Sequence, residues 1–258
     1  MVNTWYVLLE RYALSYALIL SRLTGLMVIA PFFAGFSLPL EIMVILLIAL
    51  GYLTLMNIPI LTTINLPLPT IVGSVAYNFF IGFIIGLIAY TIVSSVYVGS
   101  EIFGIQSGFN VSGSLDPTVE ESPITSEFIY LISIYIFVSL KGHLVLYEAL
   151  VNSFQKFPIL ITDIPFKEIN NLYYKVFIDT FLFSLQIALP LIGLMFLINV
   201  LFGILSRLVP QMNVFMVAMP ASTMIMFLLM VVMIPVWVEL ISKMVYKMEP
   251  YIAQLLSR

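Results

Sequence analysis

The sequence places three charged side chains inside or next to long apolar runs. Arg22 lies near the middle of the first run, Asp179 lies near the start of a later one, and Glu101 follows the third. Charged groups at such positions are costly in a membrane, and they commonly mark ion or substrate pathways. For Arg22 the alternatives are a structural role, as an ion pair or a clamp on backbone carbonyl groups, and a role in transport.

The residue types that most enzymes need are scarce in this chain. It has no cysteine and one histidine, His143, so it offers neither a thiolate site nor a two-histidine metal site. The sequence contains no zincin, nucleophile-elbow, P-loop or dinucleotide-binding signature. We therefore expect no enzyme activity, no cofactor and no bound metal. The lack of a basic cluster argues against nucleic-acid binding.

Apolar helices must position these charged residues. The chain has 258 residues, of which 62% are hydrophobic and 9% are charged, which is typical of a polytopic α-helical membrane protein. A membrane span takes about 20 apolar residues. Six stretches are candidates: 12–30, 38–57, 69–98, 124–140, 172–202 and 213–248. The first is expected to be a retained helix and not a signal peptide, because Arg11 and Arg22 interrupt it.

Three of these six helices are longer than a membrane needs. The third, fifth and sixth have about 30 residues or more, or roughly 45 Å, against about 30 Å for the apolar layer. Pro190, Pro220 and Pro235 are expected to kink the last two helices. The segment 141–157 is expected to form an amphipathic helix that lies on the membrane surface or docks on a partner subunit.

A stripe of small residues and a glycine-rich loop lie in and after the third helix. Asn78, Gly82 and Gly86 recur every four residues, which predicts close packing against another helix. The loop at 107–122 is rich in Gly and Ser and contains no Lys or Arg. It is an ordinary solvated loop or a re-entrant pore element. Irregular backbone at membrane depth is tolerated only inside protein or beside a water-filled cavity.

Four ordered motifs resemble the flagellar biosynthetic protein FliR family, which includes the matching components of virulence type III secretion systems. They are RLTGLMVIAPFF at 22–33, EIFGIQSG with the later DP at 101–117, KGHLVLYEALVNSFQKFP at 141–158 and NVLFGILSRLVPQMNVFMVAMP at 199–220. Together the motifs extend over essentially the whole chain. Two positions depart from the family pattern: Lys141 stands where Asn is usual, and Ala218 stands where Gly is usual.

The resemblance implies a subunit of the type III protein export gate. The implied fold is an all-α polytopic membrane protein with long kinked hairpins, which co-assembles into a helical complex. Residues 1–170 would form a FliP-like part and residues 171–258 a FliQ-like hairpin. The implied partners are FliP-like and FliQ-like subunits, FlhB-like and FlhA-like components, unfolded proteins in transit and membrane lipid. The implied location is the bacterial inner membrane, at the flagellar basal body.

Three sets of candidate site residues follow. The resemblance implies that the loop at 107–122 plugs the channel, through Gly108, Phe109, Asn110, Val111, Ser112, Gly113, Ser114, Leu115 and Asp116. Packing between subunits is expected at Asn78, Gly82, Gly86, Arg22, Glu101 and Gln106. The tip between the last two helices is expected to contact the FlhB-like partner through Arg207, Gln211 and Asn213.

Two alternatives to a flagellar export subunit stay open. One is the corresponding subunit of a virulence injectisome. The other, from a different class, is a small-solute secondary carrier, although no internal repeat is apparent. The positive-inside rule places both termini in the cytoplasm and Arg207 outside, whereas the family resemblance turns the tip with Arg207 towards the cytoplasm.

Overall fold

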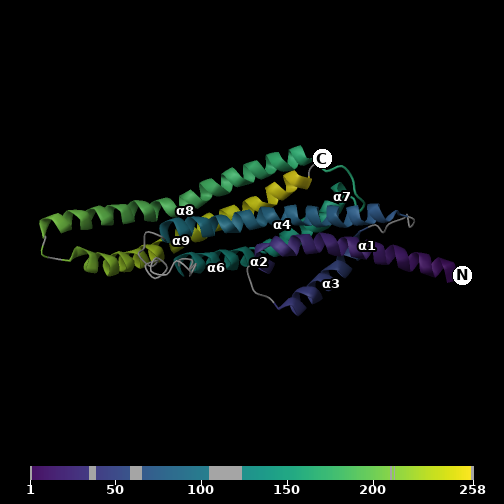
Figure 1. Ribbon diagram of the computed structural model, residues 1–258, viewed down its shortest axis with the longest axis horizontal. Helices are drawn as coiled ribbons and strands as arrows, with labels where there is room; N and C mark the ends of the chain where they lie inside the picture. The colour runs from purple at the N-terminus through teal and green to yellow at the C-terminus, as the bar shows by residue number, and fades with distance from the viewer. Residues whose placement is uncertain are drawn as a thin grey trace. The chain divides into compact units, whose positions relative to one another are not determined.

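The protein is all-α over the part of the chain that the computed structural model describes. The described residues are 2–34, 39–58, 66–104, 124–209, 211 and 213–256, and none of them lies in a strand. Figure 1 shows the helices: α1 (Val2–Ile29), α2 (Pro31–Ala34), α3 (Leu40–Asn57), α4 (Leu68–Gly104), α6 (Ile124–Ser139), α7 (Gly142–Lys156), α8 (Phe166–Leu208) and α9 (Val214–Leu256). The expected all-α, polytopic class is confirmed.

Five of the described helices are long and apolar enough to cross a membrane. The expected fourth span differs, because α6 has only 16 residues and passes the same test only together with α7, from which it is bent by 60°. The bend falls at Lys141, whose φ of 59° lies in the left-handed region. Asn adopts this conformation more readily than Lys, so the Asn that the resemblance leads one to expect would suit this position. The six expected spans become five, or six if the bent pair is one span.

The long helices expected from the sequence are present. α4 has 37 residues, and α8 and α9 have 43 each. At a rise of 1.5 Å per residue, 43 residues extend over about 65 Å, roughly twice the apolar thickness of a bilayer. α8 continues through Pro190, and α9 continues through Pro220 and Pro235. Much of each helix therefore has to lie outside the hydrocarbon layer or at a steep tilt.

The predicted amphipathic helix is confirmed as α7. Four polar residues lie on its exposed face: Lys141, Glu148, Asn152 and Gln155. Four apolar residues lie on its buried face: Leu146, Leu150, Phe154 and Phe157. The chain itself covers this apolar face, so neither lipid nor a partner subunit is needed to cover it. A stretch without helix, residues 157–165, follows α7 and is called the connector below.

The chain divides into two compact units. Unit 1 consists of Met1–Thr91, Lys141–Val176 and Lys247–Arg258, and unit 2 consists of Ile92–Leu140 and Phe177–Tyr246. α4, α8 and α9 each contribute residues to both units. The predicted division into residues 1–170 and 171–258 follows resemblance to other subunits and not contacts within the chain, so it stays a prediction.

In unit 1, α1 and α4 approach closely because glycines leave room for the facing backbone. A Cβ on Gly25 would collide with the carbonyl oxygen of Phe79, and a Cβ on Gly82 would collide with that of Arg22. A Cβ on Gly86 would lie 2.9 Å from another carbonyl oxygen of α1. The small-residue stripe thus packs against a helix of the same chain. Its contact with another subunit stays a prediction.

Unit 2 is held together by aromatic rings and a further close approach. The rings of Phe103 on α4 and Trp237 on α9 stack with centroids 5.6 Å apart. The indole Nε1 of Trp237 donates a hydrogen bond of 3.4 Å to the carbonyl oxygen of Ile187 on α8. A Cβ on Gly99 of α4 would lie 2.7 Å from the carbonyl oxygen of Ser184. These contacts connect the unit 2 parts of α4, α8 and α9.

The glycine contact in unit 1 makes a testable prediction. Gly82→Ala is expected to lower the stability of unit 1, because its Cβ forces the backbones of α1 and α4 apart. Overpacking of this kind typically costs about 1–3 kcal/mol. Gly203→Ala is the matched control, since nothing lies within 4 Å of a Cβ there and alanine favours the helix by about 1 kcal/mol. The Tm of both purified variants in one detergent measures the difference, and equal values would contradict the close contact.

Candidate functional site

A fully buried arginine is the most polar feature in the core of unit 1. Arg22 lies on α1, and its side chain is inaccessible to solvent. Its Nε and Nη2 donate hydrogen bonds of 3.0 and 2.7 Å to Oδ1 of Asn78 on α4, and Nη1 donates one of 2.9 Å to Oγ of Ser153 on α7. The guanidinium carbon lies 3.7 Å from the ring centroid of Phe154. The guanidinium is therefore hydrogen-bonded along its edge and stacked on its face.

Arg22 also binds backbone carbonyl groups of the connector. Its Nη2 donates hydrogen bonds of 2.9 Å to the carbonyl oxygen of Phe157 and 3.3 Å to that of Pro158. Asn78 continues the series, since its Nδ2 donates a bond of 2.7 Å to the carbonyl oxygen of Ile159. Among the described residues, every hydrogen-bond acceptor of Arg22 is neutral. The arrangement is the carbonyl clamp, one of the alternatives that the sequence left open.

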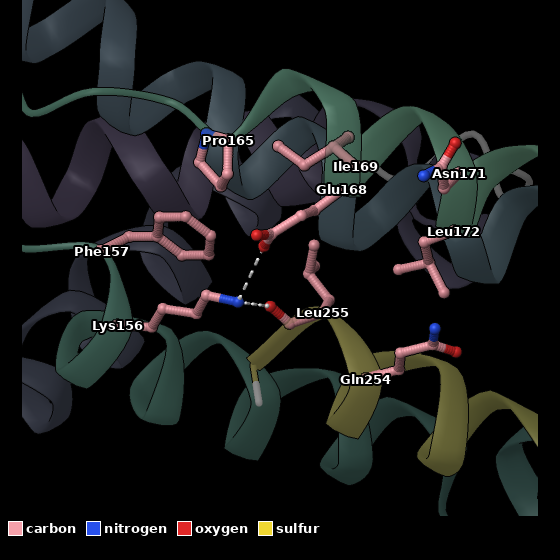
Figure 2. A pocket seen from close by; sticks show the side chains of 9 residues that line it. All are labelled: Lys156, Phe157, Pro165, Glu168, Ile169, Asn171, Leu172, Gln254 and Leu255. Atoms are coloured by element: carbon pink, nitrogen blue, oxygen red, sulfur yellow. Dashed lines mark hydrogen bonds and ion pairs between the residues drawn. The ribbon is translucent and has the colours of Figure 1, made fainter. Parts of the chain in front are cut away.

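A pocket of about 270 Å³ lies elsewhere in unit 1, where the connector meets the ends of three helices. Figure 2 shows the ammonium group of Lys156 between the carboxylate of Glu168 and the carbonyl oxygen of Leu255. The Nζ donates a hydrogen bond of 2.9 Å to that carbonyl oxygen and lies 3.8 Å from Oε2 of Glu168. Leu255 is in the last turn of α9, where a helix favours positive charge. Lys156 thus ties the end of α7 to the end of α9.

This pocket offers little for metal or cofactor chemistry. Its side chains supply one ammonium group, one carboxylate and the amides of Asn171 and Gln254, beside apolar walls. The ammonium group already binds groups of the chain itself. Within the described ranges, no three side chains of His, Cys, Asp or Glu lie close enough together to hold a metal ion.

Some of the predicted packing residues lie at the Arg22 clamp, and others lie elsewhere in the chain. Arg22 and Asn78 are in direct contact, and Gly82 lies against the backbone of Arg22. Glu101 lies on the unit 2 part of α4 and is half-buried. Gln106 lies outside the described residues, as does the whole predicted plug at 107–122.

The three residues predicted at the hairpin tip are all exposed, among them Gln211. Arg207 lies in the last turn of α8, where its charge favours the helix end. Oδ1 of Asn213 accepts a long hydrogen bond of 3.4 Å from the backbone nitrogen of Met216, in the first turn of α9. Asn213 therefore acts as the N-terminal cap of α9 in addition to any contact with a partner.

The end of the α8–α9 hairpin carries exposed apolar side chains on both helices. They are Leu194, Phe196, Leu197, Val200, Leu201, Ile204, Leu205, Leu208, Met216, Val217, Met224, Phe227, Leu228, Val231 and Val232. The sequence from 180 to 238 contains one charged residue, Arg207. An apolar surface of this extent needs lipid or another protein to cover it.

These features define the class of protein: an all-α polytopic membrane protein with a sealed polar clamp and an uncovered apolar hairpin. Within that class, the chain matches the bacterial export proteins, family 1, over residues 13–248, and it belongs to this family.

Three relatives bear the name flagellar biosynthetic protein FliR. The chain is 30% identical over 155 residues to the protein of Bacillus subtilis, which covers 59% of this chain and 60% of that one. It is 26% identical over 229 residues to the protein of Aquifex aeolicus, and the matched residues cover 88% of this chain and 87% of the relative. It is 26% identical over 159 residues to the protein of Escherichia coli, and the matched residues cover 60% of this chain and 59% of the relative. The chain spans less than two thirds of the Bacillus and Escherichia relatives.

The sequence indicated Arg22 and Asn78 but not the groups that they bind. Ser153, Phe154 and Pro158 stand out in the sequence only as part of a motif, without a role. The bound carbonyl groups belong to backbone, and any residue type supplies a carbonyl oxygen. The one signal in the sequence is the proline at 158, which ends α7 and leaves nearby backbone without helical partners.

The tie at Lys156 makes a prediction in which two nearby substitutions differ. Lys156→Met removes the hydrogen bond to Leu255 and is expected to lower the free energy of unfolding by about 1 kcal/mol. Glu168→Ala is expected to change it by less than about 0.5 kcal/mol, because this carboxylate is 72% exposed and 3.8 Å from the ammonium group. Thermal unfolding of the purified variants measures both effects. A larger loss from Glu168→Ala than from Lys156→Met would contradict this assignment.

Proposed function

We propose that this chain is a membrane subunit of the flagellar protein export apparatus. The observation that carries the proposal is membership of the bacterial export family over residues 13–248. The relatives from Bacillus, Aquifex and Escherichia bear a flagellar name, which favours a flagellar system over an injectisome. The five or six apolar helices among the described residues suit a subunit of the bacterial inner membrane.

Within that apparatus, the chain forms part of the channel through which unfolded proteins leave the cell. The exposed apolar end of the α8–α9 hairpin supports this role, because such a surface suits contact with other apolar subunits. The proposed partners are FliP-like and FliQ-like subunits, with an FlhB-like component near the entrance and an FlhA-like component beneath. No catalytic step is part of the proposal.

A small-solute carrier is the second class of function, and the site argues against it. Carriers use ionisable groups that face a substrate or ion pathway near the middle of the membrane. Of the three charged residues that the sequence places in or next to apolar runs, Arg22 lies nearest the middle of a run, and it is fully buried and bound by groups of the same chain. This argues that Arg22 has a structural role within unit 1 and does not line a pathway.

Purification and gene removal test the proposal together. A tagged chain, isolated from its own cells in mild detergent, is expected to bring FliP-like and FliQ-like proteins with it. Cells without the chain are expected to secrete no flagellar filament protein, and the full chain should restore secretion. A chain that purifies alone, from cells whose filaments do not need it, would overturn the proposal and favour a carrier. Loss of injectisome secretion with normal filaments would assign the chain to that system instead.

Substitutions at the hairpin tip test the proposed contact with the FlhB-like partner. We place the FlhB-like partner against Arg207, Gln211 and Asn213, which are exposed and include the one charge between 180 and 238. Arg207→Ala is expected to reduce secretion and cross-linking to that partner without reducing the amount of assembled complex. Lys175→Ala, at an exposed basic residue of α8 in unit 1, is the control. Normal secretion and cross-linking in the Arg207 variant would make the tip a simple turn.

The loop at 107–122 is proposed to close the channel at rest. It lies outside the described residues, and its support is its composition, since Gly and Ser pack without bulk and yield easily to a passing chain. Removal of residues 109–115 is expected to raise ion leak across the membrane while assembly stays normal. An equal shortening of the segment 59–65 is the control. Unchanged leak in an assembled complex would remove the plug from the proposal.

A further inference from the structure

The connector has no helical structure, and parts of it lie in the interior of unit 1 while Pro158 and residues 161–163 are exposed. Phe157 and Ile159 are buried, with 3% and 8% of their surface exposed. The connector lies against α1 and α4, both of which contain candidate membrane spans. Backbone carbonyl groups buried in such surroundings need donors from elsewhere in the protein. The folded chain must therefore supply donors that the connector itself does not have.

Side chains of α1 and α4 supply these donors to three successive residues. Arg22 donates to the carbonyl oxygens of Phe157 and Pro158, and Asn78 donates to that of Ile159. Because Arg22 is charged, its hydrogen bonds are roughly twice as strong as those between neutral groups. Three consecutive carbonyl groups are thus held from one side by two adjacent helices.

The same face of α4 holds the next part of the connector. Ser74 Oγ accepts a hydrogen bond of 3.1 Å from the backbone nitrogen of Ile161. The hydroxyl of Tyr77 lies 2.9 Å from Oγ1 of Thr162. Asn78 Nδ2 also donates a bond of 2.7 Å to the carbonyl oxygen of Ser74, which fixes the orientation of its amide. Ile159, Ile161 and Thr162 of the connector therefore bind three polar residues, Asn78, Ser74 and Tyr77, that share one face of α4.

The glycine contact between α1 and α4 places the two main donors next to each other. Gly82 is one turn beyond Asn78 on α4, and it touches the backbone of Arg22. This close approach holds the guanidinium within reach of Oδ1 of Asn78. Both donors are thus set by a contact that does not involve the connector.

We propose that Arg22 and Asn78 form a receptor, built when α1 and α4 pair, whose ligand is the connector of the same chain. Arg22 is a positioning residue: by binding the connector it sets where α7 ends and where α8 begins. The competing explanation is that Arg22 and Asn78 pair only to satisfy each other between two apolar helices, as polar residues do in membrane helix pairs.

A double substitution separates these two explanations. Replacing both partners of a hydrogen bond by apolar groups of similar shape is nearly neutral when the partners serve only each other. The double variant Arg22→Met with Asn78→Leu should then behave normally. If the two residues are the receptor, this variant leaves the carbonyl groups of Phe157, Pro158 and Ile159 without these donors, and the connector is released.

The chain has no cysteine, so one introduced thiol reports on the connector. Ile159→Cys places the thiol at a buried connector position, and Ile187→Cys places it at a fully buried position of unit 2. Each reporter is combined with Arg22→Met, Asn78→Leu and the double substitution. The rate of maleimide labelling is measured in the full-length chain, in mild detergent.

The receptor predicts labelling of Ile159→Cys that is at least about tenfold faster in the double variant, with the rate at Ile187→Cys unchanged. Arg22→Lys should give an intermediate rate at Ile159→Cys, because an ammonium group keeps the charge but lacks the planar fork of donors. An unchanged rate at Ile159→Cys in the double variant would overturn the receptor. Faster labelling at both reporters would also overturn it, because Arg22 would then be needed for the whole fold and not to position the connector.

Discussion

The constraint on which unit 1 depends is that a charged or polar group buried among apolar helices must have hydrogen-bond partners. Arg22 carries a full charge into the middle of α1, and the connector brings carbonyl groups that no helix satisfies. Each would destabilise the core alone. Together with Asn78 and Ser153 they satisfy each other, and the ring of Phe154 covers the face of the guanidinium. The polar cluster is stable because all of its members are present.

This cluster depends in turn on the glycine contact between α1 and α4. Without Cβ atoms at Gly25 and Gly82 the two backbones come close enough for Arg22 to reach Asn78. In unit 2, Gly99 likewise allows a close helix contact, and the nearby packing involves the stacked rings of Phe103 and Trp237 and not a buried charge. Gly193 and Gly203, by contrast, have nothing within 4 Å of a Cβ. The part of α8 that contains Gly193 and Gly203 is therefore less closely packed than the part near Gly99, and its apolar side chains are exposed.

The buried polar cluster of unit 1 and the exposed apolar hairpin of unit 2 suit a subunit of a larger assembly. Exposed apolar side chains on both helices of a hairpin are unfavourable in water, so lipid or protein must cover them. In the proposed function, neighbouring subunits of the export apparatus would cover that surface. The enclosed state of Arg22 agrees with a role in building the subunit.

The sequence by itself determined the helical class, the long helices and the two faces of α7, because apolar length and a period of 3.6 residues are local properties. It also singled out Arg22 and Asn78, since a charge and an amide stand out in apolar runs. Only the tertiary structure decided that the predicted fourth span is short and bent at Lys141, and that Arg22 clamps carbonyl groups of residues 157 and 158. The physical reason is that these acceptors are backbone atoms more than 130 positions away, and residue identity carries no record of where a carbonyl group will lie once the chain has folded.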